Sequence, residues 1–246
     1  MSDTSKAVIF GYEQGVTMPG LVAPARRVGL FMHDNTAASF TADGGKLFNA
    51  AINWARGASG SLSGSMVISP SGNSVNLTAE GILDWAHWGM GSPTSFDHKR
   101  GISPQIGNYS RIGTSSPSWL QDNPTTFSWT DGTPTISASN TPTGVHTNGV
   151  GNGFEITVPA NTNLNTLKLH VGLWRAQGKL EATLSDGSAP PFTNTSLTNN
   201  SGTSNGIYTI QFRALASGQI LRIKYTVLTD HYAPYGNVTL EAATLE

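Results

Sequence analysis

TLKLHVGLW, at residues 166–174, decides the fold because its apolar and polar side chains alternate with a period of two. Leu167, Leu169 and Val171 occupy every second position, with Lys168 and His170 between them. This alternation is typical of a strand that turns one face to a core and the other to water. The stretch therefore predicts a half-buried β-strand.

The same period continues through the C-terminal part of the chain, from Val75 onward. Its further stretches are KLEATLSDG (179–187), IYTIQFRA (207–214), QILRIKYTVL (219–228) and NVTLEAATL (237–245). Turn signals such as DGTP, GNG and SNG separate them. Roughly ten strands over about 170 residues predict a mainly β domain at 75–246, a two-sheet antiparallel β-sandwich of jelly-roll type. The expected core is Leu167, Leu169, Val171, Leu180, Leu184, Ile210, Phe212, Leu221, Ile223 and Leu240.

The first 56 residues follow a different pattern. Residues 6–13 and 26–32 are short apolar runs that predict two strands, and residues 41–57 predict a helix with Thr41 as N-cap and Gly57 as the stop. Such an incomplete α/β segment at 1–56 is too small to bury a core alone. It is therefore expected to dock on the sandwich, to pair with another copy, or to have lost its partner strands.

Residues 57–74, GASGSLSGSMVISPSGNS, are rich in Gly and Ser and predict a flexible linker between the two parts.

Composition excludes several classes of function. The 246 residues carry a net charge of −1, only 12% are charged, and none is cysteine. No basic surface is therefore expected for nucleic acid or an anionic membrane, and disulfide and thiolate chemistry are absent. No apolar run is long enough to insert into a membrane. The Ser/Thr/Asn-rich style predicts an extracellular or cell-surface bacterial protein; since no signal peptide is recognisable at the start, we expect a longer parent or a lost leader.

No catalytic motif is recognisable. The spacings of a nucleophile elbow, a zinc protease, a phosphate loop and a dinucleotide fingerprint do not occur. A non-catalytic protein is therefore expected. Carboxylates that meet only in the fold leave a polysaccharide hydrolase or lyase as a weaker alternative.

The stretch LDWAHWGMG (83–91) concentrates two tryptophans and a histidine. In a regular strand Trp85 and Trp88 point to opposite faces, so one is expected in the core and the other outward or under a loop. A hydrogen bond from His87 to Asp97 would tie the stretch to FDHKRG (96–101). The cluster is a structural element, a ligand site that includes Trp88 and His87, or a metal site formed with His98 and an acid.

Aromatic residues in loops are the second indication of a site. Trp119 lies in SSPSWLQDNP, Trp174 ends its strand before RAQG, and Tyr232 lies in DHYAPYG. An indole or phenol ring can stack on the apolar face of a pyranose, while polar groups such as Arg175 and Asp230 bind its hydroxyls. Other polar groups expected nearby are Gln121, Asp122, Asn123, Gln177 and His231. The alternative is that each ring only plugs an end of the sandwich.

The runs DWAHWG, FSWTDGTP, GNGFEITVPA and LHVGLW, followed by GKLEATLSDGS, resemble the galactose-binding-like and carbohydrate-binding β-sandwich modules of secreted bacterial proteins. The resemblance implies a glycan partner and a structural calcium ion held by loop carbonyls. Residues 8–55 resemble the C-terminal end of class I amidotransferase-like domains, without their catalytic part.

These observations lead to one main hypothesis: an accessory module of a secreted bacterial protein that attaches it to glycan by aromatic stacking. The structural alternative is an assembly domain of a surface protein that self-associates through residues 6–56 and binds no small ligand.

Overall fold

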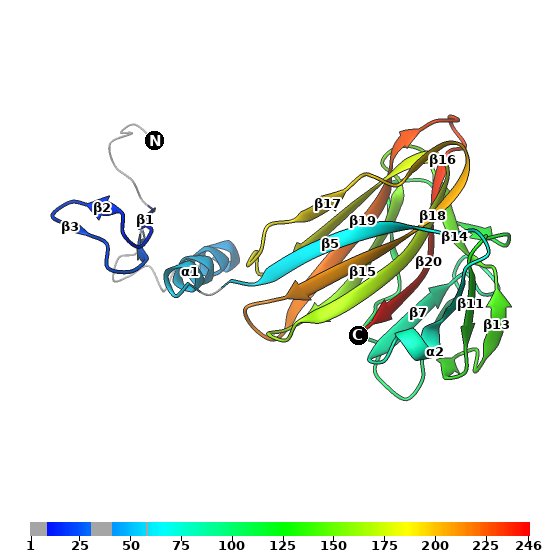
Figure 1. Cartoon of the computed structure of the whole chain (residues 1–246), viewed down its shortest axis with the longest axis horizontal. Coiled ribbons are helices and arrows are strands. Elements are labelled where there is room, and N and C mark those ends of the chain that lie inside the picture. The colour runs from blue at the N-terminus through cyan, green and yellow to red at the C-terminus, as the bar shows by residue number, and fades with distance from the viewer. Residues whose placement is uncertain (1–8, 31–40, 58) are drawn as a thin grey trace.

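The computed structural model describes residues 9–30, 41–57 and 59–246, and in these ranges the protein is mainly β (Figure 1). The N-terminal elements are β1 (Phe10–Tyr12), β2 (Thr17–Met18), β3 (Leu21–Val22), β4 (Arg27–Gly29) and α1 (Ala42–Ala55). The elements that follow are β5 (Ser61–Ser69), β6 (Ser74–Asn76), α2 (Leu77–Glu80), β7 (Asp84–Trp88), β8 (Phe96–Lys99), β9 (Ser110–Ile112), β10 (Ser118–Leu120), β11 (Thr126–Trp129), β12 (Gly132–Thr133), β13 (Ala138–Thr141), β14 (Gly144–Asn148), β15 (Gly153–Ala160), β16 (Asn165–Leu184), β17 (Phe192–Asn194), β18 (Thr198–Arg213), β19 (Gln219–Asp230) and β20 (Asn237–Leu245).

The 20-residue strand β16 organises the sandwich. Its first half pairs antiparallel with β18 on one side and β20 on the other, and its second half pairs with β19 and β17. Because β16 changes partners along its length, the sheet curls around the core (Figure 1). The predicted mainly β, antiparallel sandwich is confirmed.

All ten residues of the predicted core are buried in one hydrophobic cluster between the layers. A smaller cluster lies on the outer face of the β7–β20 region, where Phe127 and Trp129 of the short sheet β13-β11-β6 cover Trp85 and Ala242. The main sheet is therefore covered by protein on both faces at this end, and all residues of its strand β7 are buried.

The segment RAQG, expected to follow the end of a strand, lies inside β16 instead. Arg175 adopts a φ of 45°, and the register with β18 shifts between Trp174 and Ala176. A single residue in the left-handed region makes a β-bulge, which bends a strand without ending it. Trp174 and Arg175 are thereby displayed at the bend.

Residues 61–69, expected to be flexible linker, form β5 and pair with β18 over nine residues. Leu62 and Met66 pack against the core, and Phe192 lies so close to Gly64 that a Cβ there would be 2.6 Å from its ring. Serines at 61, 63 and 65 alternate with Leu62, Gly64 and Met66, so a linker-like composition concealed a strand. Ala58 lies outside the described residues.

The N-terminal segment contains the predicted strand–strand–helix arrangement. β1 pairs with β4, and the Thr41 hydroxyl accepts a hydrogen bond from Gly44 N at 3.0 Å as the N-cap of α1. Parts of the two predicted strands, residues 6–8 and 31–32, lie outside the described ranges. No described side chain of α1 is buried, and no described helix is long and apolar enough to cross a bilayer.

Candidate functional site

The candidate site lies on the outer face of five neighbouring strands, β18, β16, β20, β14 and β10. Beside the small covering sheet, this face is open. One row across it joins Asn205, Gly172, Thr239 and His146, which are direct partners in the ladders. The next row joins Thr203, Trp174 and Asn237. Strand register therefore places on one patch residues that lie almost a hundred positions apart.

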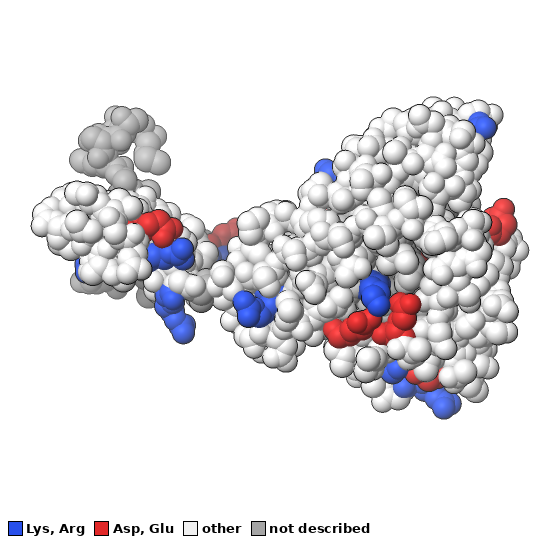
Figure 2. Space-filling model, viewed as in Figure 1, with Lys and Arg blue, Asp and Glu red and all other residues white. Residues whose placement is uncertain are grey.

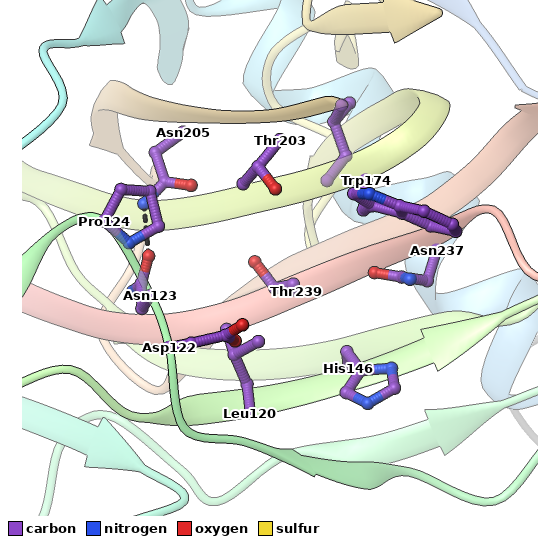
Figure 3. A pocket seen from close by; sticks show the side chains of 11 residues that line it. Leu120, Asp122, Asn123, Pro124, His146, Trp174, Thr203, Asn205, Asn237 and Thr239 are labelled. Carbon is purple, nitrogen blue, oxygen red and sulfur yellow. Dashed lines mark hydrogen bonds between the residues drawn. The ribbon is translucent and has the colours of Figure 1, made fainter. Parts of the chain in front are cut away.

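These residues line a cavity of about 280 Å³ (Figure 3). Trp174, Asn237 and His146 lie towards one end in this view, and Asn123 and Asn205 towards the other. Leu120, Asp122 and Pro124 complete the wall from the β10 side. Small-molecule sites occupy about 300–1,000 Å³, so this cavity suits one small ring or one terminal unit of a larger ligand.

Gly172 keeps the middle of the cavity open. A Cβ there would lie 2.6 Å from Asn205 Oδ1, 2.6 Å from Thr239 Oγ1 and 2.8 Å from Glu241 Oε1. Such contacts are too close for any side chain. The glycine therefore allows three polar side chains to converge over the backbone of β16.

Asn123 closes the buried end of the cavity. The residue is 4% exposed, and its Oδ1 accepts from Asn205 Nδ2 at 2.5 Å and from Thr125 N at 3.3 Å. Its Nδ2 is buried and acts on the Glu241 carboxylate, whose charged form it stabilises. Asn123 therefore links Asn205 to Glu241 and fixes the polar floor of the cavity.

Glu241 lies behind the cavity and holds two residues of its lining. Its position in β20 is a bulge, because His170 pairs with Ala242 and Val171 with Leu240. The carboxylate accepts from Thr239 Oγ1 at 3.0 Å and from Asn205 Nδ2 at 3.5 Å. Burial raises the pKa of Glu241 to about 7, although the Asn123 amide and the Thr239 hydroxyl stabilise its charged form.

The opposite side of the cavity carries His146, whose Nδ1 has no described hydrogen-bond partner. Burial lowers the pKa of His146, and the negative charge of Asp122 opposes that effect only in part. The ring is therefore neutral at neutral pH, and can donate or accept but carries no charge for a ligand.

An aromatic rim adjoins the cavity at Trp174. The guanidinium of Arg175 lies 5.2 Å from the centre of the Trp174 ring and 4.6 Å from that of Tyr232. Tyr232 and Tyr235 pack at 5.9 Å and are 48% and 60% exposed. Four of the predicted site residues thus meet here, since Asp230 fixes the same loop by accepting from Tyr232 N and Gly236 N.

The other three predicted site residues lie elsewhere. Trp119 is half-buried, outside the cavity lining, and its Nε1 donates to Gly89 O at 2.6 Å. Trp88 and His87 are 0% exposed. Including them in a ligand site was wrong, because both faces of β7 are covered by protein.

Trp85 and Trp88 take opposite faces, as expected. Trp88 enters the main core, and Trp85 enters the smaller cluster, where the segment that carries Phe127 and Trp129 covers it, so neither ring points outward. His87 pairs with Asp97 in the strand register, yet its Nε2 contacts Thr143 O at 3.2 Å, and Asp97 accepts from Thr135 N.

No donor set for a metal is assembled. Within the three described ranges, no three His, Asp or Glu side chains come close enough together to hold an ion. Several loop carboxylates bind backbone N–H groups instead, such as Asp186 to Ser188 and Leu215. A structural calcium ion stays a prediction.

Sequence reasoning missed most of the cavity lining. It named Asp122 and Asn123 as polar candidates, but not His146, Asn205, Asn237 or Thr239. A signal exists in NVTLE, where Asn237, Thr239 and Glu241 alternate with two core residues. Without the register, nothing indicated that this polar face meets those of β14 and β18.

Charge is sparse around the sandwich. Figure 2 shows that most of the surface in view is neither acidic nor basic. Lys and Arg are absent from the described residues that line the cavity.

Comparisons with known proteins identify no family. No family model matches the chain, and no curated protein matches its sequence. Among solved structures it is similar to the enzymatically active domain of tailspike protein 4 of bacteriophage CBA120, with a TM-score of 0.35 and 11% identity over 58% of this chain. The match spans only 19% of that tailspike chain.

Two further similar structures are carbohydrate-binding modules. CBM36 in complex with calcium and xylotriose has a TM-score of 0.30 and 8% identity, covering 56% of this chain and 99% of that one. TmCBM61 in complex with β-1,4-galactotriose has a TM-score of 0.34 and 10% identity, covering 56% and 87%. Likenesses of this size assign no activity, so the function has to be argued from the cavity.

Proposed function

We propose that the chain is a non-catalytic carbohydrate-binding module that holds one sugar unit in the cavity beside Trp174. The observation that carries the proposal is a cavity in which the Trp174 ring lies beside uncharged polar side chains, among them Asn237 and Thr203. Sugars need both features, because a pyranose has an apolar face of C–H groups and a rim of hydroxyls.

In this arrangement Trp174 contacts the apolar face of the sugar. Asn237, Thr203 and Asp122 line the same cavity and are available to its hydroxyls. Tyr232 and Tyr235 extend the surface outward for the next unit of a longer glycan. Arg175 acts as a positioning residue, since its guanidinium lies over the rings of both Trp174 and Tyr232.

Such a module would keep a secreted or surface-bound bacterial protein close to polysaccharide. Binding that relies on one ring and a few hydrogen bonds is weak for a single unit and strengthens when several copies or sites act together.

The test is retention of the full chain in native gels that contain neutral polysaccharides, followed by calorimetric titration with oligosaccharides of the retained polymer. Trp174→Ala is expected to weaken binding about tenfold or more. Trp119→Ala is the matched control, because it removes the same ring outside the cavity, and it is expected to bind normally. Absence of retention on every polysaccharide would refute the proposal, as would release of reducing ends by the purified protein.

Self-association through residues 6–56 is a second proposal, supported by exposed apolar side chains. In the described part of this segment Phe10, Leu21 and Val22 are 50%, 48% and 57% exposed. Light scattering at several concentrations tests it, and a strict monomer would argue against it.

A further inference from the structure

We infer that the cavity selects neutral glycans and rejects those whose bound unit carries a carboxylate or another anionic group. The inference rests on the proposed function and adds the class of sugar. It follows from the distribution of charge and of free hydrogen-bond donors around the cavity.

One carboxylate lines the cavity and a second carboxyl group lies behind it. Asp122 is exposed in the cavity wall, and Glu241, 1% exposed, lies behind Thr239 and Asn205. No described Lys or Arg lines the cavity to offset the charge of Asp122. A bound anion would therefore lose its hydration and gain no cation in return, which is costly at a buried site.

The donors left in the lining are uncharged. The Thr239 hydroxyl donates to Glu241, Asn205 Nδ2 donates to Asn123 and Thr125, and Asn237 Nδ2 donates to Tyr235 O. The Thr203 hydroxyl and the Trp174 indole N–H also belong to the lining. A carboxylate accepts several hydrogen bonds and can donate none, so a few neutral donors do not replace the cation that it lacks.

A hydroxyl fits the same surroundings well. It can accept a hydrogen bond from a neutral donor of the lining, such as the Thr203 hydroxyl, and donate its own proton to an acceptor such as the Asp122 carboxylate or a neutral His146 nitrogen. The polar lining is thus complementary to an uncharged hydroxyl-bearing ring and not to its oxidised counterpart.

Arg175 is the positive group nearest to this region, and its contacts keep it out of the cavity. Its Nε donates to Ser201 O at 3.2 Å, and its guanidinium lies over the Trp174 and Tyr232 rings. It is not part of the lining. Its charge therefore acts on the rim, where water screens it.

The experiment compares matched ligands on the full chain. Each neutral oligosaccharide that binds is titrated beside the same oligosaccharide whose terminal hydroxymethyl group has been oxidised to a carboxylate, at fixed pH 7.5 and ionic strength. We expect the oxidised member to bind about tenfold more weakly or worse. Asp122→Asn is expected to reduce this discrimination, taken as the ratio of the two affinities within the same variant, to about threefold. Glu181→Gln, which removes one charge from β16 outside the cavity lining, is expected to leave it unchanged.

The outcomes separate the two proposals. If both members bind equally, or the oxidised member binds better, the inference on charge is overturned while glycan binding stands. If neither member binds, the proposed function fails and this inference fails with it. If Glu181→Gln relaxes the discrimination as much as Asp122→Asn, the selectivity arises from overall charge, and the assignment to the cavity is overturned.

Discussion

His87 is expected to make the protein sensitive to acid, although it takes no part in binding. The ring is 0% exposed and lies 5.0 Å from Trp129 and 5.5 Å from Phe127, measured between ring centres. Its Nε2 contacts Thr143 O, and its Nδ1 has no described partner. Burial lowers the pKa of His87 from 6.5 to about 3, because a charged imidazole loses its hydration there.

The effect on stability follows from proton linkage. Below pH 6.5 the unfolded chain takes up a proton on this histidine, while the folded chain does not until about pH 3. Stability is therefore fully present above pH 6.5 and is lost as the pH falls. At about 1.4 kcal/mol for each pH unit, the loss reaches about 3 kcal/mol at pH 4 and about 4 kcal/mol at pH 3, where the folded chain also begins to take up the proton.

His87→Phe removes the proton site and keeps a ring in the aromatic cluster. At pH 7 the variant should be less stable than the wild type by about 1–3 kcal/mol, because Thr143 O loses its buried partner. Between pH 7 and pH 4 the variant should gain about 3 kcal/mol of stability relative to the wild type, because only the wild-type unfolded chain is stabilised by a proton on residue 87.

Urea unfolding of both proteins at pH 7, 6, 5 and 4, at constant ionic strength, measures this difference. Phe127→Leu is the control: it disturbs the same cluster without a titrating group, so its offset from the wild type should stay constant. A constant offset for His87→Phe as well would refute the reasoning and mean that the folded protein accommodates a charged His87.

Three further predictions concern the cavity and the chain ends. Relative to the wild type, Glu241→Gln should gain about 3 kcal/mol of stability as the pH rises from 4.5 to 7, because only in the wild type does the unfolded chain ionise at a carboxyl group that the fold keeps largely protonated; urea titrations of both proteins measure this difference, and a difference that stays constant with pH would contradict the prediction. Gly172→Val should weaken glycan binding about tenfold or more in calorimetry, since even a Cβ lies 2.6 Å from Asn205 Oδ1, and undiminished affinity would show that the sugar binds elsewhere. A chain of residues 59–246 should melt within about 2 °C of the full chain, because α1 buries no described side chain, whereas a fall of about 8 °C would show that the N-terminal segment stabilises the sandwich.

The sequence by itself determined the strands, the core and the helix. Alternation of period two is a local property, so Leu167, Leu169 and Val171 identify the buried face of β16 without any knowledge of its neighbours. The cap at Thr41 is equally local. Composition gave the wrong prediction at two places. Gly and Ser predicted a flexible linker where β5 forms, and RAQG predicted the end of a strand where β16 continues through a bulge at Arg175.

The tertiary structure alone decided the site. Asn205, Gly172, Thr239 and His146 form one row only because β18, β16, β20 and β14 pair in a particular register. A shift of one residue in any ladder would turn that strand's polar side chains into the core. The burial of His87 and Trp88 was also decided by the tertiary structure. Their strand β7 looks half-exposed in sequence, but β13-β11-β6 covers its second face. Local periodicity specifies what each strand buries, whereas pairing between distant strands specifies which polar groups meet.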